Sequence, residues 1–216
     1  MYLRILSALF VLAAAPVLPQ ASAHQPASDP PAGANDLGFQ YVLPDDWQIV
    51  TTPALSTSSE GKAAQQTPDA EEKKGIGCLQ VVLTARHGAP PSVVVVDALP
   101  FDCYGQKLTN RDLPGFGSGA AEGLKQAFDI SSPIEASYTV AGHKMWIERA
   151  RALPKGKTAP RYTVEIACTL LRKGVVCWMA QAADEAGLQV FEESSVILDG
   201  MPAPALVPPD IFVNSH

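Results

Sequence analysis

The chain has 216 residues and a formal net charge of −6 at pH 7, from 16 Lys and Arg against 22 Asp and Glu. This length suits one domain with a sizeable core. An acidic chain without basic clusters is not typical of proteins that bind nucleic acid or anionic lipid. No apolar run beyond the N-terminus is long enough to cross a bilayer.

The first 23 residues have the pattern of a secretory signal peptide. Arg4 precedes an apolar run over residues 5–18, and the small-residue triplet Ala21-Ser22-Ala23 follows. The run is too short for a spanning helix, so we expect cleavage after Ala23 and a secreted or periplasmic protein. An uncleaved membrane anchor stays open as the alternative. The Pro-rich residues 24–37 then form a disordered tether.

Two polar segments frame the first strands of the expected domain. Residues 39–43 and 47–51 alternate as two short strands around a turn at Pro44-Asp45-Asp46. Residues 53–77 contain almost no large apolar side chain and cannot offset their ordering entropy by burial. They predict a flexible insert with at most one helical turn.

Three hairpins and two helices are expected in the remainder. The hairpins pair 78–85 with 92–99, 134–140 with 143–152, and 161–171 with 175–181. Because residues 93–96 are apolar on both faces, their strand is expected at the centre of the sheet. Residues 101–112 read as irregular. The helices are 120–128, capped by Ser118, and 184–198, and residues 200–216 read as a Pro-rich tail.

These elements predict a single α+β domain over residues 38–199, with a central antiparallel sheet flanked by helices. Four cysteines in an oxidising compartment indicate two disulfides. The last hairpin places Cys168 opposite Cys177, and the first brings Cys78 near Cys103, so these two pairs are favoured. Buried free thiols stay open as the alternative.

The sequence assigns no catalytic, cofactor-binding or metal-binding residue. Residues 115–120 match the letters of a dinucleotide-binding loop but lack a preceding strand. No nucleophile elbow occurs, and no spacing supports a triad of Ser118, His143 and an Asp. We expect His87 and His143 to be solvated, and Asp45-Asp46 to serve the turn rather than a cation.

Two further sets of side chains receive structural interpretations. Glu148, Arg149 and Arg151 read as an exposed strand face, and the three tryptophans as core residues. No zinc site is expected, because the histidines and cysteines are not clustered at ligand spacing.

Three short stretches resemble the PsbP-like superfamily, which includes the bacterial DcrB-type proteins. They are Phe39 to Trp47 with its Leu-Pro turn, Gly142-His-Lys-Met-Trp146, and Val175-Val-Cys-Trp178 followed by residues 184–198. The resemblance spans about 39–198 and implies an α/β/α sandwich with a central antiparallel sheet. It also implies a non-catalytic binding, assembly or chaperone-like role, with no catalytic residues to transfer. The polar insert departs from it, since that family has an early helix there.

We therefore expect an exported, non-catalytic accessory module of the cell envelope that uses no cofactor and binds a protein partner. The alternative is a periplasmic hydrolase whose site forms only in three dimensions, with His87 or His143 beside a Ser and a carboxylate. A third possibility is a structural envelope component held by the Pro-rich tail. The sequence identifies neither the ligand or partner nor the oligomeric state.

Overall fold

The computed structural model describes residues 35–43, 46–50, 70–88, 92–105, 108–208 and 211–212. The signal peptide, most of the tether and residues 53–69 of the insert lie outside these ranges. A seven-stranded antiparallel sheet has the order β2-β3-β4-β8-β7-β6-β5. Its strands are β2 (Trp47–Ile49), β3 (Gln80–His87), β4 (Ser92–Pro100), β5 (Phe128–Val140), β6 (His143–Pro154), β7 (Tyr162–Leu170) and β8 (Gly174–Ala182).

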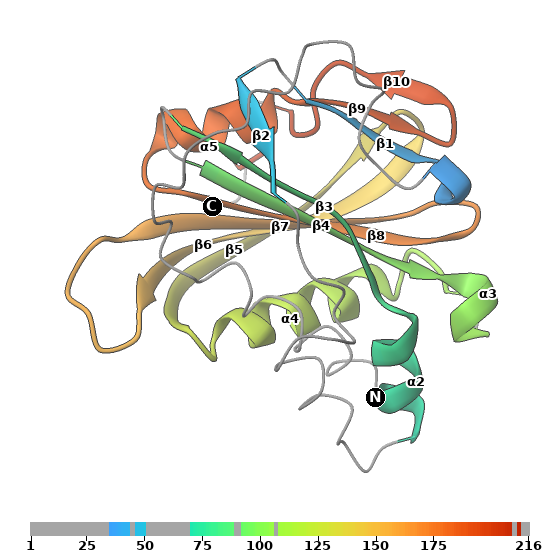
Figure 1. Cartoon of the computed structure of the whole chain (residues 1–216), viewed down its shortest axis with the longest axis horizontal. Helices are drawn as coiled ribbons and strands as arrows, with labels where there is room; N and C mark the ends of the chain where they lie inside the picture. The colour runs from blue at the N-terminus through green and yellow to red at the C-terminus, as the bar shows by residue number, and fades with distance from the viewer. Residues whose placement is uncertain are drawn as a thin grey trace.

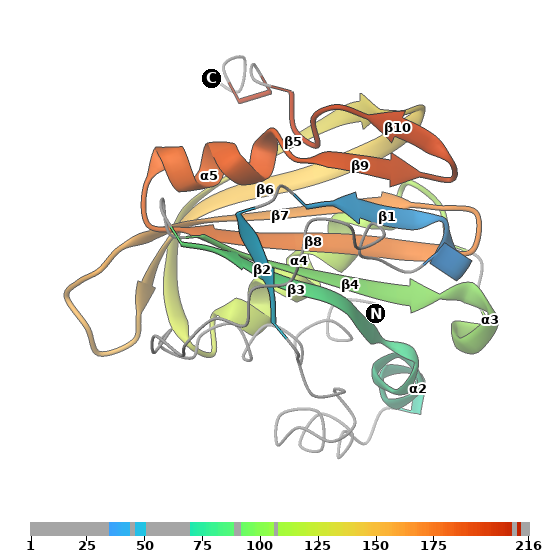
Figure 2. The same cartoon turned by 45° about the horizontal axis from the view of Figure 1, so that its top comes forward.

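Further elements cover both faces of this sheet (Figure 1). On the face drawn lower lie α2 (Ala70–Cys78), α3 (Phe101–Tyr104) and α4 (Leu113–Leu124). On the upper face lie α5 (Glu185–Glu192) and a three-stranded sheet of β1 (Phe39–Val42), β9 (Ser195–Leu198) and β10 (Met201–Ala203), in the order β1-β9-β10. Figure 2 shows α5 and this small sheet in one layer above the large sheet. The predicted α+β class, with a central antiparallel sheet flanked by helices, is confirmed. In the described ranges, every helix is too short or too polar to span a bilayer.

The three predicted hairpins are present as β3–β4, β5–β6 and β7–β8. β4 is the third strand from one edge and is buried on both faces, as its run of valines predicts. The β7–β8 turn closes with a hydrogen bond from the Leu171 N–H to the Gly174 carbonyl, 2.9 Å long. These pairings are local in sequence, which is why strand alternation and turn residues predict them.

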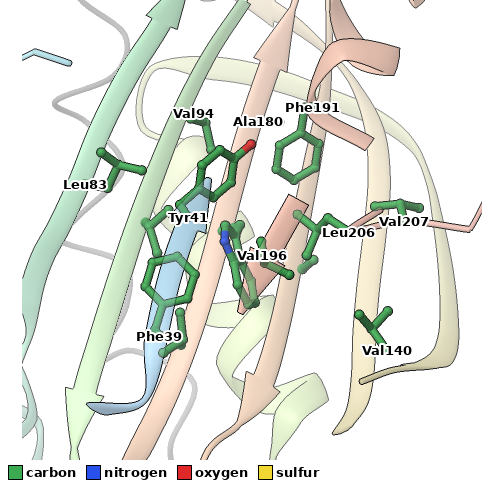
Figure 3. Close-up of a cluster of buried hydrophobic side chains, with 14 of the residues drawn as sticks. Phe39, Tyr41, Leu83, Val94, Val140, Ala180, Phe191, Val196, Leu206 and Val207 are labelled. Atoms are coloured by element: carbon green, nitrogen blue, oxygen red, sulfur yellow. The ribbon is translucent and has the colours of Figure 1, made fainter. Parts of the chain in front are cut away.

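Two hydrophobic layers enclose the large sheet. The lower layer packs α4, through Phe116 and Leu124, against Trp146 and Ile166 of the sheet. Figure 3 shows the upper layer, where Phe39, Tyr41, Phe191, Val196 and Leu206 gather over the strands. The ring centres of Phe39 and Trp178 are 5.3 Å apart in an edge-to-face contact. The buried Tyr41 hydroxyl donates a hydrogen bond of 2.5 Å to the Ser194 hydroxyl.

The helix predicted over 120–128 with Ser118 as its cap is wrong in its bounds. α4 begins at Leu113, with Asp112 as N-cap residue and a proline in the first turn, and it ends at Leu124. Proline is favoured in a first turn because the missing N–H would have no partner there. The Asp112 carboxylate instead accepts the Thr109 N–H at 2.7 Å, which fixes the turn that leads into the helix. Ser118 therefore lies inside the helix and caps nothing.

The helix predicted over 184–198 is also too long. Asp184 is the N-cap residue and accepts the Gly187 N–H at 2.8 Å, but α5 ends at Glu192. Ser195–Leu198 instead forms β9, which pairs with β1 on one side and β10 on the other. β10 corrects the prediction of a Pro-rich tail without strand structure. Alternation in β9 buries Val196 and Leu198 against the large sheet, which outweighs their helical spacing.

The insert predicted over 53–77 ends in a helix rather than a loop. α2 spans Ala70–Cys78, and its Ile76 and Cys78 are buried in the lower layer. Burial of these two side chains and the covalent link at Cys78 hold a segment that has no other large apolar residue. The two strands expected around the Pro44 turn both exist, but β1 belongs to the small sheet and β2 to the large one.

Candidate functional site

Both disulfides lie on the lower side of the large sheet. Cys168 and Cys177 face each other across β7 and β8, with Cα atoms 4.1 Å apart. Cys78 joins α2 to Cys103 of α3, with Cα atoms 5.6 Å apart. These are the two pairs that the hairpin registers favour. Disulfides of this kind are typical of proteins that fold in an oxidising compartment.

A group of charged side chains on the upper face comprises Arg149, Glu165 and Glu192, here called the Arg149 cluster. Arg149 of β6 donates from Nε to the Glu165 carboxylate of β7 at 2.6 Å. Its terminal nitrogen pairs with the Glu192 carboxylate at the end of α5. Glu165 is fully buried, whereas Arg149 and Glu192 are partly exposed. The guanidinium thus joins two strands and a helix through charge-assisted hydrogen bonds.

This environment shifts the titration of nearby groups. Burial raises the pKa of the Glu165 carboxyl, and repulsion from Glu192 adds to this, while Arg149 opposes it. Burial and the same two carboxylates raise the pKa of the Tyr138 hydroxyl on β5. Tyr138 therefore stays neutral and donates a hydrogen bond of 3.1 Å to the Leu206 carbonyl.

The chain after β10 covers the Arg149 cluster. The N–H groups of Leu206 and Val207 both donate to the Glu192 carbonyl at 3.0 Å, and both side chains are buried. The Arg149 guanidinium lies 4.1 Å from the ring centre of Phe212, a cation–π contact. The cluster thus fastens the C-terminal segment to the sheet.

The sequence predicts that His143 is solvated, but the structure places its ring between two polar groups. Its Nδ1 lies 2.9 Å from the Leu170 carbonyl, and its Nε2 lies 3.6 Å from the Asp199 carboxylate. That carboxylate also accepts the Arg172 N–H at 3.1 Å, and the Asp199 N–H donates to the Gly38 carbonyl at 2.7 Å. Asp199 therefore connects the turns at one end of both sheets, and this contact shields His143.

His87 is not solvated either, because it belongs to β3 and not to the following turn. It is 6% exposed, and its Nε2 lies 2.5 Å from the Asp46 carboxylate. Its ring lies against that of Trp47, with centres 5.7 Å apart. In the β3–β4 register, Ser92 is directly opposite His87. A Ser, a His and an Asp thus meet at the end of this hairpin, a grouping that no sequence spacing reveals.

The structure divides the set predicted to be exposed, Glu148, Arg149 and Arg151, between the two faces of the large sheet. Arg149 and Arg151 point to the upper side, whereas Glu148 points under α4 and is 8% exposed. Burial raises its pKa, and repulsion from Glu135 on β5 adds to this. The carboxyl borders a cavity of about 10 Å³ whose other walls are apolar. That volume accommodates one water molecule rather than a substrate.

Asp97 of β4 is a second buried carboxyl on the lower face of the large sheet. It is opposite Cys177 in the register, and neither of its oxygens has a hydrogen-bond partner in the part of the chain described. Burial raises its pKa to about 8. No candidate from the sequence includes Asp97, although its position directly after four valines of a central strand marks it as buried.

The other sequence candidates occupy structural positions. Residues 115–120, which match the letters of a nucleotide loop, lie within α4, where most of them are buried. Trp47, Trp146 and Trp178 are all core residues, as predicted. Over the ranges described, His, Cys, Asp and Glu side chains nowhere gather in threes that could hold a metal ion.

Comparison with known proteins gives structural likenesses. No family model matches the chain, and no curated protein matches it. The fold is similar to LpqN of Mycobacterium tuberculosis, a protein involved in cell envelope biogenesis, with a TM-score of 0.41 and 15% identity over 83% of this chain and 87% of that one. It is also similar to the cyanobacterial PsbP of Synechocystis, with a TM-score of 0.40 and 12% identity over 80% and 91% of the two chains.

Proposed function

We propose that this protein is an exported, non-catalytic accessory module that binds another protein of the cell envelope. The signal-like leader and the two disulfides support a location outside the cytoplasm. The observation that carries the proposal is that three polar contacts of this protein connect elements of its fold. The Arg149 cluster, the His143–Asp199 contact and the His87–Asp46 pair each tie separate elements of the fold together.

Side chains that are held in such contacts are poorly suited to general acid–base chemistry. A catalytic acid or base has to reach within hydrogen-bond distance of the reacting atom. Glu165 is fully buried beneath Arg149, and that guanidinium already contacts two carboxylates and the Phe212 ring. His143 is held between the Leu170 carbonyl and Asp199. A rigid scaffold of this kind presents its surface to a partner instead.

The test is recovery of a partner from the native envelope. The mature protein, tagged in its own host and isolated by gentle detergent extraction, is expected to retain one protein in a fixed stoichiometric ratio through a salt wash. The matched control is the same tagged protein with its disulfides reduced and blocked. Recovery of the same ratio with this control, or hydrolytic turnover by the purified protein, would contradict the proposal.

One observation favours hydrolysis as a second candidate function. His87 is paired with Asp46, and Ser92 is its cross-strand neighbour, so the three residue types of a nucleophilic triad adjoin. The Ser92 hydroxyl is buried and makes no hydrogen bond to another described residue. In this arrangement His87 orients towards the carboxylate without accepting the Ser92 proton, so the nucleophile is not activated.

A pair of serine variants separates the two functions. If the protein is a hydrolase, activity on a panel of ester and amide substrates is lost in Ser92→Ala and kept in Ser137→Ala, which changes an exposed serine on β5. If it is a binding module, neither the parent protein nor either variant turns over any substrate, and all three recover the partner equally.

A further inference from the structure

The outer edge of β5 is the longest strand edge of the large sheet. β5 spans Phe128–Val140, and among the described strands it pairs only with β6. Between Ser131 and Ile134 the register shifts, and Ser132 has a positive φ of 53°. This bulge leaves Ile134–Val140 as a regular seven-residue stretch, here called the β5 edge. Such a stretch is about 24 Å long.

The β5 edge has few of the features that normally prevent strands from pairing with other chains. Those features include very short strands, lysines, prolines, inward-pointing charges and β-bulges. In β5 the bulge and Pro133 lie just before the seven-residue stretch and not within it. The opposite edge strand, β2, is only three residues long. The β5 edge contains no lysine or proline, and its one charged residue, Glu135, accepts the Trp146 indole N–H at 3.3 Å.

The two faces of the β5 edge differ in polarity. Ile134, Ala136 and Tyr138 point to the upper face, opposite Arg149, Ile147 and Met145 of β6. Ile134 is 40% exposed and the other two are half-buried, which leaves an apolar stripe along the outer strand. The hydrogen bond from Tyr138 to the Leu206 carbonyl holds one end of this stripe in place. The intervening residues on the lower face are polar.

We propose that the β5 edge pairs with the β5 edge of a second copy of this chain, antiparallel and about a two-fold axis at Ser137. In this register Ser137 faces its own equivalent, Ala136 faces Tyr138, and Glu135 faces Thr139. No charge stands opposite a like charge, and the largest side chain meets the smallest one, so the edge is complementary to itself. The same patch serves both copies, as an isologous interface requires.

The size of the edge sets the strength of the association. One strand pair with a single row of apolar side chains is smaller than a standard stable interface. The dimer is therefore weak and concentration-dependent, and the two seven-stranded sheets become one continuous sheet across the axis. This pairing is independent of the hetero-partner proposed above, because it needs only the chain itself.

Sedimentation equilibrium of the mature, disulfide-intact protein tests the dimer. The apparent mass is expected to rise towards twice the monomer value as the concentration increases. Ser137→Lys places two ammonium groups across the axis and is expected to weaken dimerisation by about tenfold or more. The matched control, Thr158→Lys, adds the same charge to an exposed loop and leaves dimerisation unchanged.

Amide hydrogen exchange identifies the residues at the dimer interface, and urea unfolding shows whether the lysine variants still fold. In the dimer, the outward amides of residues 134–140 are expected to gain protection as the concentration rises, while the urea midpoints of both lysine variants stay near that of the parent. A protein that is monomeric at every concentration overturns the proposal. So does a dimer that Ser137→Lys leaves intact, or protection of residues 134–140 that appears only with a different protein bound.

Discussion

Gly117 of α4 lies directly against the indole of Trp146, and a β-carbon built on Gly117 would overlap the six-membered ring. The contact lets the helix approach the large sheet closely at β6 and β7. It also accounts for the glycine at position 117, because a larger residue there separates the helix from the sheet.

Gly117→Ala is accordingly expected to destabilise the protein by about 3 kcal/mol, because the added methyl group has no space beside a buried ring. The matched control is Gly115→Ala, where a β-carbon meets no atom within 4 Å. That change is expected to stabilise α4 by up to about 1 kcal/mol through helix propensity. Urea unfolding of both variants measures the difference, and equal midpoints would show that α4 does not pack as described.

Asp97 makes stability dependent on pH. Burial raises its pKa from 3.8 to about 8, so between these values the native state keeps a proton that the unfolded chain releases. Its contribution is full below about pH 4 and is lost as the pH rises towards about 8. Asp97→Asn should therefore gain stability relative to the parent, by at most about 1.4 kcal/mol per pH unit, across this window.

Urea midpoints of the parent and of Asp97→Asn at about pH 5 and about pH 8 measure this gain. The variant is expected to keep some pH dependence of the same sign, because the pKa of Glu165 is also raised by burial. A constant difference between the two proteins over this range would mean that Asp97 does not titrate there.

The Arg149 cluster is expected to contribute strongly to stability. Arg149→Ala leaves the buried Glu165 without its partner and removes the contact with Phe212, so a loss of about 3 kcal/mol is expected. Lys125→Ala breaks the exposed pair with Glu122 and should change stability by no more than about 0.5 kcal/mol. Hydrogen exchange at the amides of Leu206 and Val207 should increase only in the Arg149 variant.

Non-reducing peptide mapping of the exported protein checks the disulfides. The expected linked peptides contain Cys78 with Cys103 and Cys168 with Cys177. Replacing Cys78 and Cys103 by alanine opens a loop of 25 residues and should reduce stability by about 3 kcal/mol, with faster exchange in α2. Linked peptides with any other pairing would contradict the positions of these four cysteines in the fold.

The leader has its own test. Mass spectrometry of the exported protein is expected to find His24 as the first residue, following cleavage after Ala23. A mature product that still begins at Met1, or retention of the protein in the cytoplasm, would remove the basis for the proposed location.

The elements that the sequence predicts well depend on neighbours in the chain. Cys168 lies opposite Cys177 because a two-residue turn fixes the register, and this can be read from a few residues. β9 depends on a distant segment, because Ser195–Leu198 pairs with Phe39–Val42. Its pairing with β10 is local, and the Asp199-Gly200 turn, with positive φ at both residues, is a hairpin signal within the sequence. Helical spacing in residues 184–198 is a local signal, and a distant strand overrides it.

The surroundings of the candidate site residues also depend on segments that are distant in the chain, which local sequence patterns do not reveal. His87 follows a strand pattern and precedes a Gly-Pro-rich segment, which indicates solvent, yet Trp47 from another strand covers it. Glu165 alternates with apolar residues as a solvated face would, but α5 and the C-terminal segment bury that face. Burial of such groups depends on which elements pack above a sheet, and strand alternation alone does not contain this information.

The pairing of β1 with β9 has a consequence for biogenesis. Tyr41 and its hydrogen-bond partner Ser194 are 153 positions apart, so the layer over the large sheet closes only after nearly the whole polypeptide has emerged. Until then β1 lacks the strand with which it pairs, so this layer is completed late in synthesis. Late completion of this layer is compatible with the export that we propose.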